Sequence, residues 1–125
     1  MLRMKRLTGK IYGRNNRMDL NTYQELAHRT SGQKTRKEII LMSALGLSGE
    51  SGEVADIIKK IIYHGHLLDE NQMVKELGDI LWYVAEMATG LGMGLDFIAT
   101  TNIRKLKLRY PDGFSSERSI KRSEE

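Results

Sequence analysis

Residues 46–60 read GLSGESGEVADIIKK, and this stretch decides how the chain folds. From Val54 onward its apolar residues recur every three or four positions, which is the period of one helix face. Three glycines and two glutamates, Glu50 and Glu53, interrupt its first half. A glycine inside a helix costs about 1 kcal/mol relative to alanine, and an unpaired buried carboxylate costs more. The stretch therefore predicts a helix whose glycines and acids are explained by what they pack against or bind.

A second acidic pair with the same spacing follows further along the chain. Glu50 and Glu53 are three residues apart, and so are Glu76 and Asp79. Residues three apart lie on one face of a helix, so each helix presents two neighbouring carboxylates. Each pair lies at the edge of the apolar stripe of its helix. If the two helices pack antiparallel, the two pairs can face each other.

Four carboxylates in one partly buried cleft predict a cation site. Such groups repel one another, so they must either take up protons or bind cations. The chain has no cysteine, and oxygen ligands without thiolates favour Mg²⁺, with Mn²⁺ as a substitute. One acidic pair alone is common on a solvated helix surface. Two pairs of the same design beside glycines favour a magnesium site that handles phosphates.

Capping signals predict four helices, at about 21–31, 36–64, 70–91 and 95–109. The helix starts have the pattern of a capping box, in which a polar residue is followed three places on by Glu or Gln: Asn21 with Gln24, Thr35 with Glu38, and Asp69 with Gln72. Helix stops are expected at Gly65, Gly92 and Gly94, and before Pro111. Strand patterns are lacking, so we expect an all-α fold resembling a four-helix bundle.

The charge distribution predicts a folded unit between two flexible tails. Residues 1–17 carry six basic residues and no acid, which leaves 4 − 6 = −2 for the rest of the chain. We expect a basic arm at 1–17, one helical domain at 18–114, and a flexible tail at 115–125. The basic character belongs to the arm, so the domain is not expected to bind nucleic acid. No apolar run is long enough for a membrane span and no secretory signal is evident, so we expect a cytoplasmic protein.

Polar residues on the third and fourth helices are candidates for contacting a substrate. Asn102 lies within the apolar stripe of the fourth helix, and a buried asparagine there is either a structural tie or a group that reads a substrate. Lys105 and Arg109 lie on the same side, where they either reach anionic oxygens or complete a solvated helix end. Tyr83 falls one turn after Asp79, whereas Trp82 points to the core or to a dimer contact.

Two further acids have no matching partner. Asp56 and Glu86 lie on the same two helices, but neither has a second acid at the required spacing on the inward side. We interpret both as surface charges.

The chain resembles the MazG-like group of all-α nucleoside triphosphate pyrophosphohydrolases. The resemblance covers about residues 18–115 and rests on three stretches: GLSGESGEVADIIKK, KELGDILWYV and NIRKLKLRYPDGFS. The signature of the group is Glu-x-x-Glu, a spacer and Glu-x-x-Asp, and here the spacer is the 22 residues 54–75. The four acids, their glycines and the closing RYPDGF are specific when taken together.

The resemblance implies a reaction and a set of site residues. The reaction is Mg²⁺-dependent hydrolysis of a nucleoside triphosphate between the α and β phosphates, which gives a monophosphate and pyrophosphate and cleans the nucleotide pool. It implies homodimers or dimers of dimers, with sites completed near a subunit interface. The implied metal ligands and water-positioning groups are Glu50, Glu53, Glu76 and Asp79. The implied nucleotide contacts are Tyr83, Asn102, Lys105, Arg109 and Tyr110.

Two alternatives stay open at this point. One is a phosphoribosyl-ATP pyrophosphatase, which has a similar helical acid motif, although the closing RYPDGF favours the first reading. The other is a non-enzymatic regulatory or nucleic-acid-binding bundle, in which the basic arm is the active part.

Overall fold

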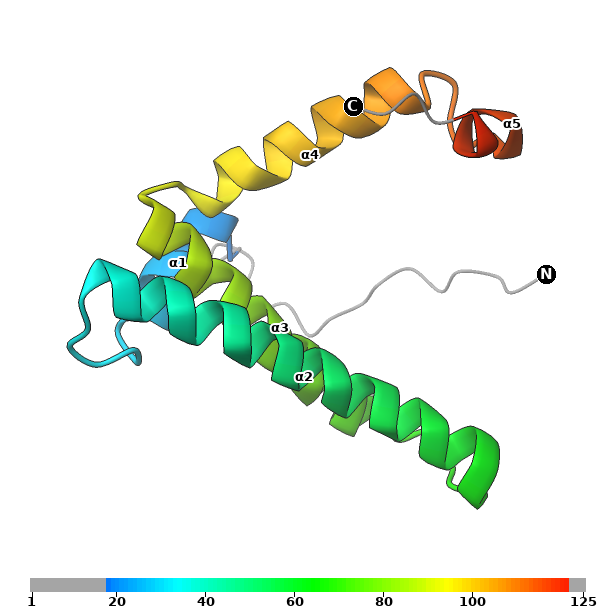
Figure 1. Ribbon diagram of the computed structural model, residues 1–125, viewed down its shortest axis with the longest axis horizontal. Coiled ribbons are helices and arrows are strands. Elements are labelled where there is room, and N and C mark those ends of the chain that lie inside the picture. Colours follow the sequence, from blue (N-terminus) through cyan, green and yellow to red (C-terminus); the bar gives the residue numbers. More distant parts are fainter. Residues whose placement is uncertain (1–17, 122–125) are drawn as a thin grey trace.

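The computed structural model describes residues 18–121, and the regular elements within this range are all helices. They are α1 (Leu20–His28), α2 (Arg36–His64), α3 (Glu70–Leu91), α4 (Leu95–Arg109) and α5 (Ser116–Ile120). Figure 1 shows α2 and α3 as a long pair lying side by side, with α1 and the start of α4 gathered at one end. The all-α prediction is confirmed. The 1–17 arm lies outside the described residues.

The helix ends follow the local capping signals closely. Thr35 and Glu38 form the complete capping box of α2, and Asp69 caps α3 by accepting bonds from the N–H groups of Asn71 and Gln72. Gly65 and Gly92 end these helices in the left-handed conformation, with φ of 71° and 69°. Such φ values favour glycine, because a Cβ is crowded there.

Two of the predicted end signals were wrong. The N-cap of α1 is Asp19 and not Asn21, because the Asp19 side chain accepts the Thr22 N–H bond. Gly94 does not stop a helix but is the N-cap residue of α4. Asn21 instead contacts the start of α4, where its side-chain oxygen accepts a hydrogen bond from the backbone N–H of Asp96 at 3.1 Å. A polar residue near a helix start can cap a different helix that packs against it.

Contacts along their length set the register of the α2–α3 pair. At one end Arg36 Nε donates to the Gly90 carbonyl at 2.7 Å, and a Cβ on Gly90 would lie 2.9 Å from Ile40. Further along, the Tyr83 ring covers Gly46. Residue numbers rise on one helix as they fall on the other, so the helices are antiparallel. This register places Glu50 opposite the turn that holds Glu76 and Asp79.

The buried core is small and lies where α1, α3 and α4 meet. Its buried members are Ala27, Ala85, Ala88 and Leu95, and partly buried Tyr23, Trp82, Val84 and Ile98 pack around it. Trp82 Nε1 donates to the Ala27 carbonyl and to Thr30 Oγ1, so of the two alternatives for Trp82, the core or a dimer contact, the structure favours the core. Gln24 bonds Thr89, the Met93 carbonyl and the Leu95 N–H, which ties α1 to the α3–α4 turn.

Glu86 is not a surface charge, and that prediction was wrong. Its side chain is 0% exposed and accepts a hydrogen bond from His28 Nδ1 at 3.1 Å. Glu86 does not lie on the stripe of α3 that faces α2. It lies on another side of α3, which α1 packs against and covers. Asp56, by contrast, is partly exposed and pairs with Lys59 and Lys60 on its own helix.

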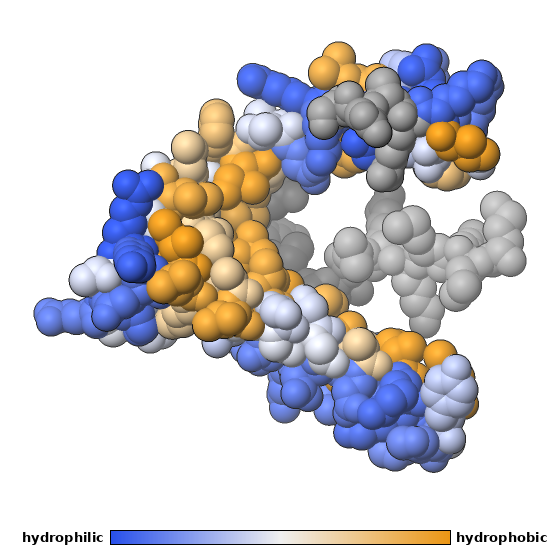
Figure 2. Space-filling view, in the orientation of Figure 1, coloured by the Kyte–Doolittle hydropathy of each residue, from blue (hydrophilic) through white to orange (hydrophobic). Residues whose placement is uncertain are grey.

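Many large apolar side chains of this single chain are exposed. Figure 2 shows apolar residues gathered over the end of the molecule where α2 and α4 begin. Exposed residues of these helices include Leu41, Phe97 and Leu45, the last with 76% of its surface accessible. Others lie further along the helices, among them Ile62, Leu67, Leu77 and Leu108. Among the described residues, the exposed large apolar residues therefore far outnumber the five buried apolar residues.

The region after α4 carries more structure than the sequence indicated. Ser115 caps a five-residue helix, α5, by accepting the Arg118 N–H bond, and the flexibility of 115–125 stays a prediction. Tyr110 and Phe114 pack their rings 5.5 Å apart between α4 and α5. Among the described residues, no helix has the length and apolar character that crossing a membrane requires.

Candidate metal centre

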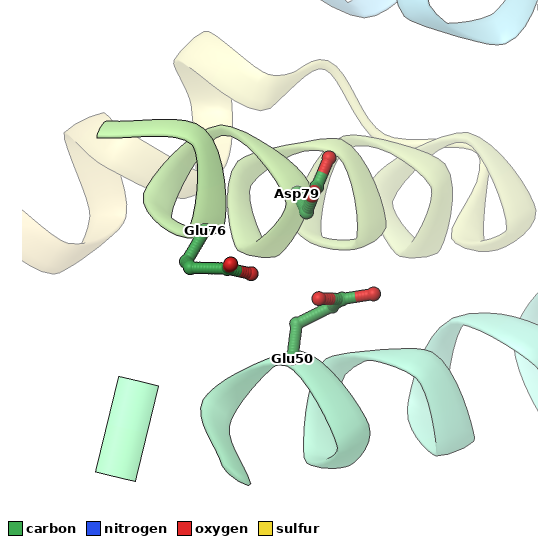
Figure 3. A group of neighbouring side chains, drawn as sticks. All are labelled: Glu50, Glu76 and Asp79. Carbon is green, nitrogen blue, oxygen red and sulfur yellow. The ribbon is translucent and has the colours of Figure 1, made fainter. Parts of the chain in front are cut away.

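Three of the four predicted acids converge between α2 and α3. Figure 3 shows Glu50 rising from α2 toward α3, which carries Glu76 and Asp79. One carboxylate oxygen from each lies within 4.8 Å of the others. Oxygens that share one Mg²⁺ are about 3 to 4 Å apart, so a shift of about 1 Å brings these three into its coordination range. The donor set, three hard carboxylate oxygens from two helices, suits a divalent cation.

The electrostatics of Glu50 reflect this crowding. Partial burial, followed by the negative charges of Asp79, Glu76 and Glu53, raises the pKa of Glu50 above its usual value. Each cause disfavours the ionised form, and a bound cation would reverse them by stabilising the charge. Among the described residues, the ion pairs with Lys or Arg do not include Glu50, Glu76 or Asp79. The site carries an excess of negative charge that suits a cation.

Glu53 lies outside the group of three. Its side chain is exposed, and it lines a neighbouring pocket of about 260 Å³ with Asp56, Lys60 and His66. Its charge still reaches the site, since it contributes to the raised pKa of Glu50. The role of Glu53 as a fourth ligand stays a prediction.

The glycines of the opening motif have different surroundings. A Cβ on Gly46 would overlap the Tyr83 ring, which lies directly on the α2 backbone at this point. Trp82 packs edge-on against the same ring at 5.0 Å between centroids. Gly49 and Gly52 have open space where a Cβ would lie. Gly46 therefore makes room for an aromatic side chain one turn from Asp79, and packing among residues 18–121 does not require the other two glycines.

Alanine substitutions should distinguish the roles of Gly46 and Gly49 in stability. We expect Gly46→Ala to destabilise the fold by about 1 to 3 kcal/mol, because the Tyr83 ring must move. Gly49→Ala should stabilise it by about 0.5 to 1 kcal/mol, because alanine is the better helix former and meets nothing. Urea unfolding followed by circular dichroism gives both values. Midpoints that shift in the same direction would contradict the assigned role of Gly46.

Tyr23 is a site neighbour that sequence reasoning missed. Burial and then the negative charge of Asp79 raise the pKa of the Tyr23 phenol, so this ring lies within electrostatic range of Asp79. It also lines a pocket of about 760 Å³, together with Leu81 and Asp96. No spacing pattern marks Tyr23, because its position depends on how α1 packs on α3.

The structure does not bring the α4 candidates to the acids within one chain. Figure 1 shows α4 diverging from the α2–α3 pair after its first turns. Asn102 and Lys105 are exposed, so the expectation of a buried Asn102 was wrong. The stripe that contains Asn102 packs on the core only at its start, through Leu95 and Ile98, whereas Ile103 and Leu106 further along are exposed. Arg109 and Tyr110 are half-buried near α5. Nucleotide contacts by these four residues, and by Tyr83 beside the acids, stay predictions.

Fold and site together define an all-α protein with a carboxylate cluster between two antiparallel helices, suited to a divalent cation. Residues 40–114, more than half of the chain, match the family described as MazG nucleotide pyrophosphohydrolase domain. The chain belongs to this family, which confirms the resemblance seen in the sequence. Proteins of this family typically depend on a divalent metal, in agreement with the acid cluster.

One similar protein is the Gene 37 protein of Mycobacterium phage L5. The two chains are 40% identical over 73 residues, which cover 55% of this chain and 64% of the phage protein. This chain thus aligns with less than two thirds of that relative. No solved structure matches the chain.

Proposed function

We propose that this protein hydrolyses nucleoside triphosphates between the α and β phosphates, giving a nucleoside monophosphate and pyrophosphate. The observation that carries the proposal is the convergence of Glu50, Glu76 and Asp79 from two helices, in a chain of the MazG family. Such a reaction suits the removal of surplus or non-standard nucleotides. The preferred base and sugar would be decided by groups around the acids and not by the acids themselves.

Glu50, Glu76 and Asp79 would hold Mg²⁺, with Mn²⁺ able to replace it. When bound, the ion supplies charge neutralisation for the phosphates and favours ionisation of water. A water oxygen forms a new bond to phosphorus as the bond between the α and β phosphates breaks, and pyrophosphate leaves. Glu53, exposed one turn from Glu50, is suited to orient that water or accept its proton.

The surroundings of the acids support a nucleotide as the substrate. The pocket of about 760 Å³ has the size of a small-molecule site and begins beside Tyr23, near Asp79. Its wall combines the apolar side chains of Met18, Leu20 and Leu81 with polar Asn21 and Asp96. We propose that this wall receives the nucleoside of a triphosphate whose phosphates lie at the acids.

A panel of ribo- and deoxynucleoside triphosphates with Mg²⁺ tests the proposal. We expect pyrophosphate and a monophosphate as products, and no turnover when EDTA replaces Mg²⁺. Phosphoribosyl-ATP belongs in the panel, because faster turnover of it would favour the alternative pyrophosphatase. Orthophosphate as the product, or no release of pyrophosphate from any member, would refute the proposed reaction.

We further propose that the protein works as a homodimer or a dimer of dimers. Exposed apolar side chains occur along α2, α3 and α4, whereas monomeric proteins seldom expose large contiguous apolar patches. A second copy would cover part of this surface, including stretches of α4 that face no neighbour in one chain. Light scattering should give two or four times the chain mass of 14.3 kDa. A mass of one chain at micromolar concentration would contradict this assembly.

A further inference from the structure

A pocket between the end of α2 and the start of α3 adjoins the acid cluster, and the proposed function gives it no occupant. Its volume is about 260 Å³. Glu53, which lines it, is one turn from Glu50 on α2, and Gln72, which also lines it, is one turn from Glu76 on α3. The full lining is Glu53, Asp56, Ile57, Lys60, Ile61, His66, Leu67 and Gln72. The same pair of helices therefore builds the acid cluster and this pocket.

The charges of the two sites act on each other through Glu53. The pKa of Glu50 is raised first by partial burial and then by neighbouring acids, Glu53 among them. The pKa of Lys60 is raised by its hydrogen bond and ion pair with Asp56 and, to a smaller extent, by the charge of Glu53. Glu53 thus lies within electrostatic range of the acid cluster on one side and of the Lys60 ammonium on the other.

Lys60 is a cation that the pocket can offer to a ligand. Asp56 pairs with Lys60 through Oδ2, but it also pairs through Oδ1 with Lys59, which does not line the pocket. Asp56 therefore keeps a cationic partner when Lys60 turns toward a ligand. The Lys60 carbonyl accepts a hydrogen bond from the backbone N–H of His66 at 3.2 Å, which holds the loop side of the pocket against the end of α2.

The distance from the acids to Lys60 suits a chain of phosphates. The Lys60 ammonium lies beside Asp56, which follows Glu50 by six residues, and six residues of α-helix span about 9 Å. The α and γ phosphates of a triphosphate are joined through two bridging oxygens, and a hydrogen bond of about 2.8 Å to an ammonium extends this reach. A water takes up about 30 Å³, so the pocket has room for a phosphate group with ordered waters.

We propose that this pocket receives the terminal phosphate of a triphosphate held at Glu50, Glu76 and Asp79, and that Lys60 binds the oxygens of this phosphate. The inference rests on the proposed function and deepens it, because it assigns the anionic end of the same substrate. An ammonium binds phosphate as a point charge, and a bound Mg²⁺ offsets only part of the negative charge of a triphosphate. Lys60 supplies a further positive charge away from the bond that breaks.

Binding of Mg²⁺-tripolyphosphate to the full-length chain tests the assignment without turnover. We expect calorimetry to show at least about tenfold weaker binding for Lys60→Gln than for the unaltered protein, since a hydrogen bond to a charged group is lost. The matched control is Lys59→Gln, which removes the same charge from the other partner of Asp56. It should change the affinity less than about twofold, because an exposed ion pair contributes little. Circular dichroism checks that both variants fold.

Mg²⁺ alone is the second ligand in this experiment. Both variants should bind it within about twofold of the unaltered protein, because neither lysine is a ligand of the ion and exposed charges are screened by salt. A loss of Mg²⁺ affinity in Lys60→Gln that equals its loss of tripolyphosphate affinity would place the effect at the acids and overturn the assignment. Equal tripolyphosphate affinity in Lys60→Gln and the unaltered protein, including no binding by either, would also overturn it. So would an equal loss in Lys59→Gln.

A nucleoside is the competing occupant of this pocket, because Ile57, Ile61 and Leu67 give it an apolar side. A changed preference among bases in Lys60→Gln, with tripolyphosphate binding unaltered, would place the nucleoside here and refute the proposal. Pyrophosphate release from nucleotides by the unaltered protein is measured separately. Release without any dependence of tripolyphosphate binding on Lys60 means that only the pocket assignment fails, whereas Lys60-dependent binding without release means that only the proposed reaction fails.

Discussion

Glu76→Gln is expected to lower kcat for pyrophosphate release by about 100-fold or more while the protein stays folded. Glutamine keeps the size of the side chain but removes the negative charge that a cation would bind. Glu76 is one of only two acids that α3 contributes to the cluster, so the loss cannot be shared among many ligands. Steady-state assays with Mg²⁺ give kcat, and circular dichroism checks the fold.

Two further substitutions sharpen this test. Asp56→Asn removes an acid from α2 that lies outside the cluster, where Lys59 and Lys60 hold the pKa of Asp56 at about 2. Its activity should stay within about twofold of the unaltered protein. Glu53→Gln should weaken Mg²⁺ binding less than Glu76→Gln does, because Glu53 lies outside the group of three. Unchanged turnover in Glu76→Gln would remove the acid cluster from the reaction.

His28→Ala should destabilise the fold by about 3 kcal/mol or more. The Glu86 carboxylate is fully buried, and its hydrogen bond from His28 is its contact across the α1–α3 interface. Removing the imidazole leaves a buried acid without that donor, and breaking one side of a buried pair typically costs about 3 to 5 kcal/mol. The His28 side chain is 44% accessible, so water would partly replace the lost imidazole and keep the loss of stability near the lower end of this range. Urea unfolding measures the change in free energy.

The double variant His28→Ala/Glu86→Met is the matched control. It removes both partners and replaces the acid with an apolar side chain of similar length, which is often close to neutral. It should therefore be more stable than His28→Ala alone. A single variant within about 0.5 kcal/mol of the unaltered protein, or a double variant that recovers nothing, would mean that Glu86 is satisfied in some other way.

Helix boundaries and the pairing of the acids could be predicted because their causes are local. Thr35 with Glu38, Asp69, Gly65 and Gly92 bond or turn within a few residues of their own positions. Glu76 and Asp79 share one face of α3 because they are three residues apart in a helix. The short turn between α2 and α3 favours an antiparallel pair, which can bring Glu50 opposite them. The structure confirms that these three acids meet.

Features that depend on a third helix could not be predicted. A helical wheel compares each residue with the stripe that faces one neighbour, and Glu86 lies on the side of α3 that a different helix, α1, covers. The same packing brings Tyr23 toward Asp79 and engages Asn21 at the start of α4. The prediction for Asn102 failed in the opposite direction, because only the start of its stripe, at Leu95 and Ile98, packs on the core, and Asn102 lies beyond that packed part and is exposed.

By itself, the sequence determined the four longer helices, the caps of α2 and α3, the antiparallel acids and the family, since all of these depend on residues close together or on a repeating period. The tertiary structure alone decided which glycine has a packing reason and which acid is buried. Gly46 is needed because the α2–α3 register lays Tyr83 on it, and Gly49 is not, although both occur in one motif. Such distinctions arise from contacts between residues far apart in the chain, and no local pattern records them.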